Sequence, residues 1–229
     1  HVDANPDLDI AANFLHCLYG EAPDTQTARL LETALVLYAE HELNASTFAA
    51  RVTPATQAHT YSRIVAAVSA LQGNLHGGAT QRSVEMLLKI GHSEDAESYI
   101  LPRLKKKEII MGFGHRVYKQ GDPRVPVLKR MCTQLAQKTG QQQIVETAAK
   151  AEEIMPREKK LHANVDYYAG LAFYLLGLGA DLFTCVFALS RTAGYLAHIA
   201  EQYRENKLIR PRGVYTGKKD LSFMPLAAR

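Results

Sequence analysis

Two neighbouring stretches decide the fold: VDYYAGLAFYLL at 165–176 and LFTCVFALSRTAGYLAHI at 182–199. Both are apolar on almost every helical face, and a helix of that kind is buried on most of its sides. We therefore expect both segments to form helices at the centre of the molecule. The longest uncharged apolar stretch, Tyr167–Ala180, is too short to span a bilayer.

Shorter amphipathic segments surround this apolar centre. Apolar side chains recur at intervals of three and four within residues 30–38, 64–71, 84–88, 125–135 and 144–154, which is the spacing of one helix face. Glycines at 73 and 140 are placed to end two of these helices, and a proline at 156 to end a third. Because no alternating pair joined by a tight turn appears, the sequence predicts an all-α fold.

The composition fits one domain or two unequal lobes. The 229 residues are 47% hydrophobic and 22% charged, so the chain can bury a large core. Residues from about 80 to about 160 are more polar than the sequence on either side. We expect this part to form a smaller domain inserted into a larger, more apolar one.

The charge and the cysteines exclude several classes of protein. Lys and Arg number 27 against 23 Asp and Glu, a net charge of +4, which allows an anionic ligand but does not indicate nucleic-acid binding. Cys17, Cys132 and Cys185 lie far apart, so we expect neither a disulfide framework nor a metal-binding pair. No HExxH motif, P-loop or dinucleotide fingerprint appears. With no secretory signal in its first residues, we expect the chain in the reducing cytoplasm.

A histidine in a glycine-rich turn is the first candidate for catalysis. His76 lies in NLHGG at 74–78, just before the helix predicted around 84–88. The positive end of a helix keeps a nearby imidazole neutral, so that it can donate one hydrogen bond to a developing oxyanion. The alternative is a turn residue that caps this helix.

A second histidine ends the loop GFGH at 112–115. Arg116, Lys119 and Arg124 follow His115 closely. Small residues with exposed N–H groups beside basic side chains suit a phosphate or a carboxylate. A lone glycine motif is a weak signal, however, and a solvated surface loop is the alternative.

Asp166 and Arg191 interrupt the two apolar stretches. Asp166 is either a cap or first-turn acid, or a base whose pKa is raised by apolar surroundings. Arg191 cannot lose its charge, and a buried guanidinium without an anion is costly. It therefore pairs either with a carboxylate of the protein or with a substrate carboxylate.

The remaining polar candidates are His41, Arg210 and Arg212. His41 lies between two glutamates and is expected to end a helix, where it is either a partner of the helix dipole or a ligand of an anion. Arg210 and Arg212 form a short basic loop of a kind that is usually solvated. No glycosidase carboxylate pair and no nucleophile elbow appears. From the residues alone, the chain suits an anionic carboxylate substrate and enolate chemistry.

The polar motifs, taken in order, resemble those of citrate synthases of the bacterial type, which includes 2-methylcitrate synthases. Six motifs carry this resemblance, which covers essentially the whole chain. They are YAEHELNAST at 38–47, LHGGA at 75–79, GFGHRVYK at 112–119 with DPR at 122–124, NVD at 164–166, SRTAG at 190–194 with AH at 197–198, and IRPR at 209–212 with YTG at 215–217.

The resemblance implies a two-lobed helical acyltransferase that condenses acetyl-CoA with oxaloacetate and hydrolyses the thioester to citrate and CoA. Residues 1–79 and 178–229 would belong to the large domain, and residues 80–177 would form the small domain that closes on it. Asp166 would be the base, His76 the donor to the thioester oxygen, and His115 the donor to the oxaloacetate carbonyl.

The resemblance also implies how the substrates are bound. The oxaloacetate and citrate ligands would be His41, Arg124, Arg191 and Arg210, with Arg210 contributed across the interface of a homodimer or higher homo-oligomer. Coenzyme A would lie by Gly112, Phe113, Gly114 and Lys119. It enters as a thioester substrate, so no further cofactor, metal, nucleic acid or membrane is expected.

Two questions stay open at this level. Acetyl-CoA and propionyl-CoA differ by one methylene, worth about 1–3 kcal/mol in a pocket, so 2-methylcitrate synthase is an alternative function. Family members also carry a substantial N-terminal portion of the large domain, whereas this chain opens on a helical pattern at 7–18. We therefore expect the N-terminal portion to be lacking, and a non-catalytic assembly protein of the same fold is the second hypothesis.

Overall fold

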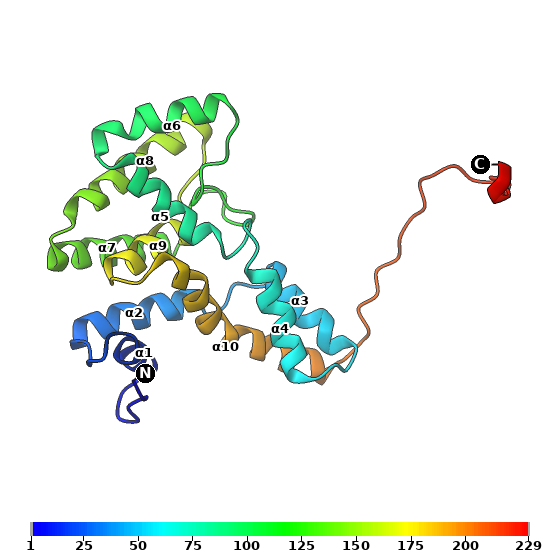
Figure 1. The fold of residues 1–229 in the computed structure, drawn as a ribbon, viewed down its shortest axis with the longest axis horizontal. Coiled ribbons are helices and arrows are strands. Elements are labelled where there is room, and N and C mark those ends of the chain that lie inside the picture. Colours follow the sequence, from blue (N-terminus) through cyan, green and yellow to red (C-terminus); the bar gives the residue numbers. More distant parts are fainter. Residues whose placement is uncertain (1, 229) are drawn as a thin grey trace.

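The computed structural model describes residues 2–228, which form helices joined by short loops (Figure 1). Within this range the backbone has no strand, only an isolated antiparallel bridge between Phe113 and Ala163. The predicted all-α fold is confirmed. The α-helices are α1 (Ile10–Tyr19), α2 (Thr25–Tyr38), α3 (Ala45–Ala55), α4 (Thr60–Leu71), α5 (Ala79–Ile90), α6 (Ala96–Lys105), α7 (Val125–Thr139), α8 (Gln142–Lys159), α9 (Val165–Leu175) and α10 (Phe183–Arg204), and the 3-10 helices are η1 (Ser93–Asp95), η2 (Ala180–Leu182) and η3 (Leu226–Ala228).

Short polar side chains set the starts of several helices. Asp9, Asp24 and Asn44 each accept the backbone N–H three residues ahead, at the N-termini of α1, α2 and α3. Asn164 accepts the N–H of Asp166 in the same way and begins α9. This cap places Asp166 in the first turn of the central helix.

The predicted end of α8 at Pro156 is wrong. The helix continues to Lys159 and ends at Lys160, whose φ of 55° is left-handed. A proline costs one backbone hydrogen bond, but it lies in the last turn of this helix. The neighbouring Ile154 and Met155 are almost fully buried, so packing outweighs the lost bond.

The apolar centre is α9, as its pattern predicts. Tyr167, Tyr168 and Phe173 have no exposed surface. The helix packs against α5 and α7, with α8 and α6 outside them, and these five helices form one group in Figure 1. α1 and α2 extend the same hydrophobic cluster, so these helices share one continuous core with α9.

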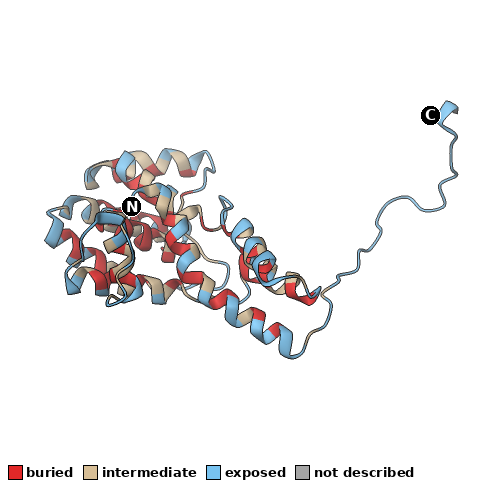
Figure 2. Cartoon of the chain, turned by 60° about the horizontal axis from the view of Figure 1, so that its bottom comes forward, coloured by how far each residue is buried: buried red, intermediate tan, exposed pale blue. Residues whose placement is uncertain are grey.

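α10 is buried less completely than its sequence predicts. Its first half packs on α2 within the main core, and its second half packs on α3 and α4 around a small cluster with Tyr195 and Ile199. Leu189 and Leu196 are exposed, as the blue faces of Figure 2 illustrate for this part of the chain. The segment Ala180–Arg204 is long and apolar enough to cross a membrane, yet 44% of its most apolar window is buried within the chain. Its packing is that of a core helix with one open face.

The chain beyond α10 runs away from the helices as an extended tail (Figure 1). Its apolar side chains, such as Val214 and Phe223, are exposed. The division into domains at residues 80 and 177 stays a prediction.

A glycine on α9 allows its close contact with α5. A Cβ atom on Gly170 would lie 2.6 Å from the Thr80 carbonyl oxygen and 2.9 Å from Val84 Cγ2. We predict that Gly170→Ala lowers the free energy of unfolding by about 1–3 kcal/mol, because backbone must move to admit the methyl group. Urea unfolding measures this, with Gly213→Ala as control, since nothing lies within 4 Å of that position. Equal midpoints for the two variants would contradict this packing.

Candidate active site

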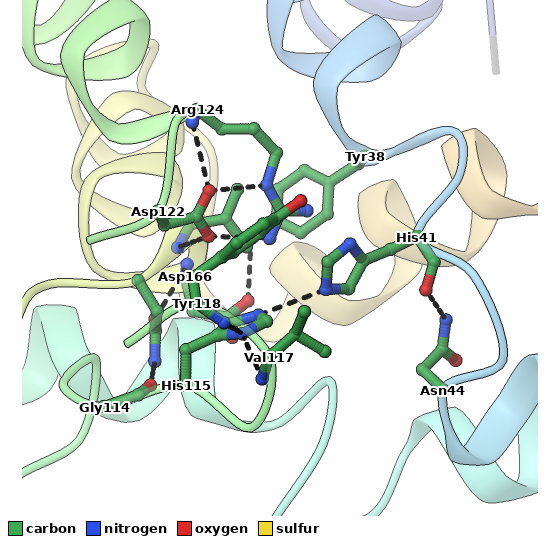
Figure 3. Close-up of polar contacts among 12 residues, drawn as sticks. Tyr38, His41, Asn44, Gly114, His115, Val117, Tyr118, Asp122, Arg124 and Asp166 are labelled. Carbon is green, nitrogen blue, oxygen red and sulfur yellow. Dashed lines mark hydrogen bonds and ion pairs between the residues drawn. The ribbon is translucent and has the colours of Figure 1, made fainter. Parts of the chain in front are cut away.

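One cavity brings together most of the polar residues singled out from the sequence. Its volume is about 380 Å³. α9, α10 and the loops that precede α3, α5, α7 and α9 supply its walls. Figure 3 shows several of these side chains. Six residues predicted to take part in catalysis or carboxylate binding line it: His41, His76, His115, Arg124, Asp166 and Arg191. Gly114, which was predicted to lie by coenzyme A, also lines it.

Backbone amides fix the tautomer of His115. Its Nδ1 accepts hydrogen bonds from the N–H groups of Val117 and Tyr118, both at 3.0 Å. The ring proton must therefore be on Nε2, which donates to His41 Nε2 at 3.1 Å (Figure 3). Burial, with the nearby Arg124 charge, lowers the pKa of His115. Neutral His115 thus presents one N–H to the cavity.

His41 lies in the loop between α2 and α3 and does not end a helix. Burial and the charge of Arg124 lower its pKa to about 4. Its Nε2 accepts from His115, so the proton of neutral His41 is on Nδ1. His41 is therefore not a partner of the α2 dipole.

His76 does not cap α5. The N-cap residue is Gly78, and the His76 side chain instead lies 2.7 Å from Ser46 Oγ through Nε2. Burial and the charge of Arg191 lower the pKa of His76 to about 4, so burial is the main cause of its neutrality. When Ser46 donates to Nε2, the ring proton is on Nδ1; when Ser46 donates to Asn44 Oδ1, at 2.8 Å, it is on Nε2.

Only one carboxylate oxygen of Asp166 accepts hydrogen bonds from the described residues. Its Oδ1 accepts from the hydroxyls of Tyr38 and Thr80, both at 2.8 Å. Oδ2 has no hydrogen-bond partner among residues 2–228, and Asp166 lines the cavity. Burial raises the pKa of Asp166, while the hydrogen bonds from Thr80 and Tyr38 oppose that rise. Neither Tyr38 nor Thr80 was predicted from the sequence to belong to the site.

Arg124 is paired with an acid that the sequence analysis did not single out. Its Nε and Nη2 donate to the two oxygens of Asp122, at 2.9 and 2.7 Å. Asp122 also accepts the N–H of Val165 at 3.0 Å, and so supports the start of α9. Burial opposes ionisation of Asp122, but the guanidinium lowers its pKa. Arg124 Nη1 is buried without a partner, which leaves a donor for an anion in the cavity.

Arg191 has no carboxylate partner in the part of the chain that the structure describes. Only 2% of its surface is exposed. Nε donates to the Tyr38 carbonyl oxygen at 2.6 Å, and the guanidinium carbon lies 4.9 Å from the centre of the Phe187 ring. Burial lowers its pKa, but a guanidinium stays charged. Arg191 therefore forms no internal ion pair within residues 2–228.

A second cavity, of about 260 Å³, shares His76 and Asp166 with the first. Gly112, Phe113 and Gly114, the loop predicted to lie beside coenzyme A, also line it. The loop is anchored to the start of α9, because Gly114 N–H donates to His162 O at 2.8 Å and Gly112 O accepts from Asn164 N at 2.9 Å. The N–H of Gly114 is therefore not free for an anion, in contrast to the prediction.

Two predicted binding residues lie outside both cavities. Lys119 is exposed, and its ammonium donates to the His115 carbonyl oxygen at 3.0 Å. Arg210 is exposed on the C-terminal tail. The described residues hold no cluster of three His, Cys, Asp or Glu side chains that suits a metal ion.

The sequence model described as "Citrate synthase, C-terminal domain" matches residues 1–212. The chain belongs to the citrate synthase family. It is 50% identical over its whole length to "Citrate synthase 2" of Bacillus subtilis, and 38% identical to "2-methylcitrate synthase" of Shewanella oneidensis; it spans 61% of the length of each. It also matches a citrate synthase from Thermoplasma acidophilum, solved in ternary complex with carboxymethyl coenzyme A and oxaloacetate, at a TM-score of 0.92 and 35% identity, covering 99% of this chain and 61% of that one.

The low pKa of His76 predicts a pH dependence of stability. His76 has a pKa of about 4 in the folded chain and 6.5 in the unfolded chain. Between pH 4 and pH 6.5 the unfolded chain therefore binds more protons than the folded chain. The free energy of unfolding then falls as the pH drops from 6.5 towards 4. We predict that His76→Gln reduces this slope by at most about 1.4 kcal/mol per pH unit.

Urea unfolding between about pH 6.5 and pH 5 measures the slope. The matched control is His162→Gln, which removes an exposed histidine. An equal slope in wild type and His76→Gln would contradict the lowered pKa of His76.

Proposed function

We propose that this chain is the catalytic part of a citrate synthase, which condenses acetyl-CoA with oxaloacetate and hydrolyses the citryl thioester to citrate and CoA. The observation that carries the proposal is the place of Asp166. Asp166 lines both a cavity with cations and neutral histidines and a cavity with a glycine loop. A base between two substrate-sized spaces suits the joining of two molecules.

The first cavity suits a keto acid with two carboxylates. Arg191 has no ion pair among the described residues, and Arg124 keeps one buried N–H unpartnered. Both can bind carboxylate oxygens. The Nε2–H group of His115 donates to His41 in this structure. With substrate bound, it would donate to the ketone oxygen instead, and His41 would bind a carboxylate.

The second cavity suits the acyl group and the pantetheine arm of coenzyme A, with Gly112, Phe113 and Gly114 beside it. Asp166 Oδ2 takes a proton from the methyl carbon, and His76 Nδ1–H holds the enolate oxygen. This role requires Ser46 to donate to His76 Nε2. A carboxylate removes so weakly acidic a proton only if the enolate is stabilised as it forms.

The enolate carbon then attacks the ketone carbon of oxaloacetate. The new carbon–carbon bond forms as the carbonyl π electrons move to oxygen, which takes a proton from His115. Water next attacks the thioester carbon, the carbon–sulfur bond breaks, and one proton of the water passes to the departing sulfur. Asp166 loses the methyl proton to solvent and His115 regains a proton from solvent, so both side chains return to their starting states. Citrate and the thiol of CoA leave.

One part of the proposal involves a second copy of the chain. Arg210 would reach the carboxylate site of that copy in a homodimer or larger homo-oligomer.

The remaining parts concern domain movement, coenzyme A and location. The small domain, residues 80–177, would close on the large one and exclude water. Lys119 would lie by the outer part of coenzyme A. A cytoplasmic location agrees with the three free cysteines.

Propionyl-CoA is the alternative acyl donor, because relatives named citrate synthase and 2-methylcitrate synthase both match the chain. The ratio of kcat/KM for the two acyl-CoAs with oxaloacetate decides between them. A preference for propionyl-CoA would make 2-methylcitrate the product.

Thiol release from acetyl-CoA with oxaloacetate tests the proposal against a non-catalytic assembly protein. We predict release by wild type and a loss of at least about 100-fold in kcat for Asp166→Asn, with KM nearly unchanged, because only proton abstraction is lost. Exchange of the acyl protons with D₂O reports the same step. Folded wild-type protein that releases no thiol with either acyl-CoA would overturn the proposal.

Arg191→Lys tests the anion site. Lysine keeps the charge but loses the planar fork, so we predict an increase in the Kd for oxaloacetate of at least about tenfold. The melting temperature should change little, since no internal ion pair is broken. Calorimetric titration measures the affinity. Near-normal affinity with a large loss of melting temperature would make Arg191 a structural residue.

A further inference from the structure

Two hydroxyls meet at one oxygen of Asp166, where α2, α5 and α9 come together. Tyr38 and Thr80 are both fully buried, and each donates to Asp166 Oδ1 at 2.8 Å. A hydroxyl has a single hydrogen, so the 3.3 Å contact between Tyr38 and Thr80 adds no further bond. The carboxylate is held from one side, and Oδ2 is left to the cavity.

Tyr38 also contacts the proposed anion site. Its carbonyl oxygen accepts from Arg191 Nε at 2.6 Å. Its ring lies against Phe187, with ring centres 4.2 Å apart, and near Phe173, at 6.1 Å. The hydroxyl of Tyr38 is therefore fixed in place, and one residue joins the buried cation to the buried acid.

Thr80 is fixed by the close contact of α5 and α9. Its carbonyl oxygen occupies the space that a side chain at Gly170 would fill. Its hydroxyl therefore reaches Asp166 across the interface of the two helices. A carboxylate with both donors on one oxygen has a defined orientation, which a freely rotating group lacks.

The two hydroxyls also act on ionisation. Burial disfavours the carboxylate form of Asp166, and hydrogen bonds to that form favour it. Tyr38 remains a donor, because burial raises its own pKa well above the ordinary value. Without the hydroxyls, Asp166 would keep its proton to a higher pH.

We propose that Tyr38 and Thr80 are positioning residues for the base: they orient Asp166 so that ionised Oδ2 alone faces the acyl substrate. This inference rests on the proposed function and adds two residues to it. Neither touches the reacting atoms; both act through Asp166.

Variants of nearly equal shape test the inference. Tyr38→Phe and Thr80→Val remove one hydroxyl each and keep the packing, and Thr80→Ser restores a hydroxyl. The matched control is Tyr168→Phe on α9, the helix of Asp166; it removes a hydroxyl that donates to Glu152 at 2.6 Å, away from the site.

We expect Tyr38→Phe and Thr80→Val to lower kcat by about tenfold or more while KM for oxaloacetate stays within about threefold. The acidic limb of the kcat–pH profile should move to higher pH, because lost donors favour the protonated acid. Thr80→Ser should recover most of the loss, and Tyr168→Phe should leave the limb in place. A kcat within about twofold and an unmoved limb in both test variants would overturn the inference.

A second measurement does not depend on turnover. The titration of Asp166 is followed by ¹³C NMR of aspartate-labelled protein, with Asp166→Asn to assign the signal. We expect an upward shift in Tyr38→Phe and in Thr80→Val, and its absence overturns the inference. Wild-type protein that shows no condensation and no acyl-proton exchange instead overturns the proposed function, even where the NMR shift is present.

Discussion

Two buried guanidinium groups share one cavity with too few protein anions around them. Arg124 is paired with Asp122, yet it keeps one unpartnered buried N–H, and Arg191 has no carboxylate partner among residues 2–228. Burial, together with this positive charge, lowers the pKa values of His41 and His76 to about 4. The histidines are therefore neutral donors and acceptors. An excess of positive charge in a small space favours an anionic ligand.

The same groups hold the helices in place around the site. Asp122 connects Arg124 to the first N–H of α9, and Arg191 connects α10 to the last residue of α2. The glycine loop at 112–114 is bonded to residues 162–164 just before α9. Asp166, in the first turn of α9, therefore has a fixed position relative to both cavities. Rigid support of this kind is what proton transfer between fixed partners requires.

Much of the fold and the site could be predicted from the sequence, for physical reasons. Apolar periodicity identifies helices because burial dominates folding, and it placed α9 at the centre. A charged or polar side chain within an apolar pattern, such as Asp166 or Arg191, is conspicuous. Tyr38 was not, because a tyrosine on a buried helix face has the pattern of a core residue, and its hydroxyl acquires a role only through a residue far along the chain.

Other features depend on tertiary contacts that no local pattern contains. Pro156 lies inside α8 because the packing of that helix outweighs one lost hydrogen bond. The N–H of Gly114 is taken by His162, so a glycine motif alone overstates the donors that are free. Arg210 lies on the tail, away from both cavities, and a role for it depends on a second copy.

We proposed that the first cavity binds the carboxylates of oxaloacetate, so that His41 and His115 give up their mutual hydrogen bond for bonds to the substrate. A crystal structure of the protein with oxaloacetate would show this exchange. We expect carboxylate oxygens on Arg191 and on Arg124 Nη1, with the ketone oxygen on His115 Nε2 in place of His41. Oxaloacetate bound elsewhere, with the His41–His115 hydrogen bond intact, would contradict it.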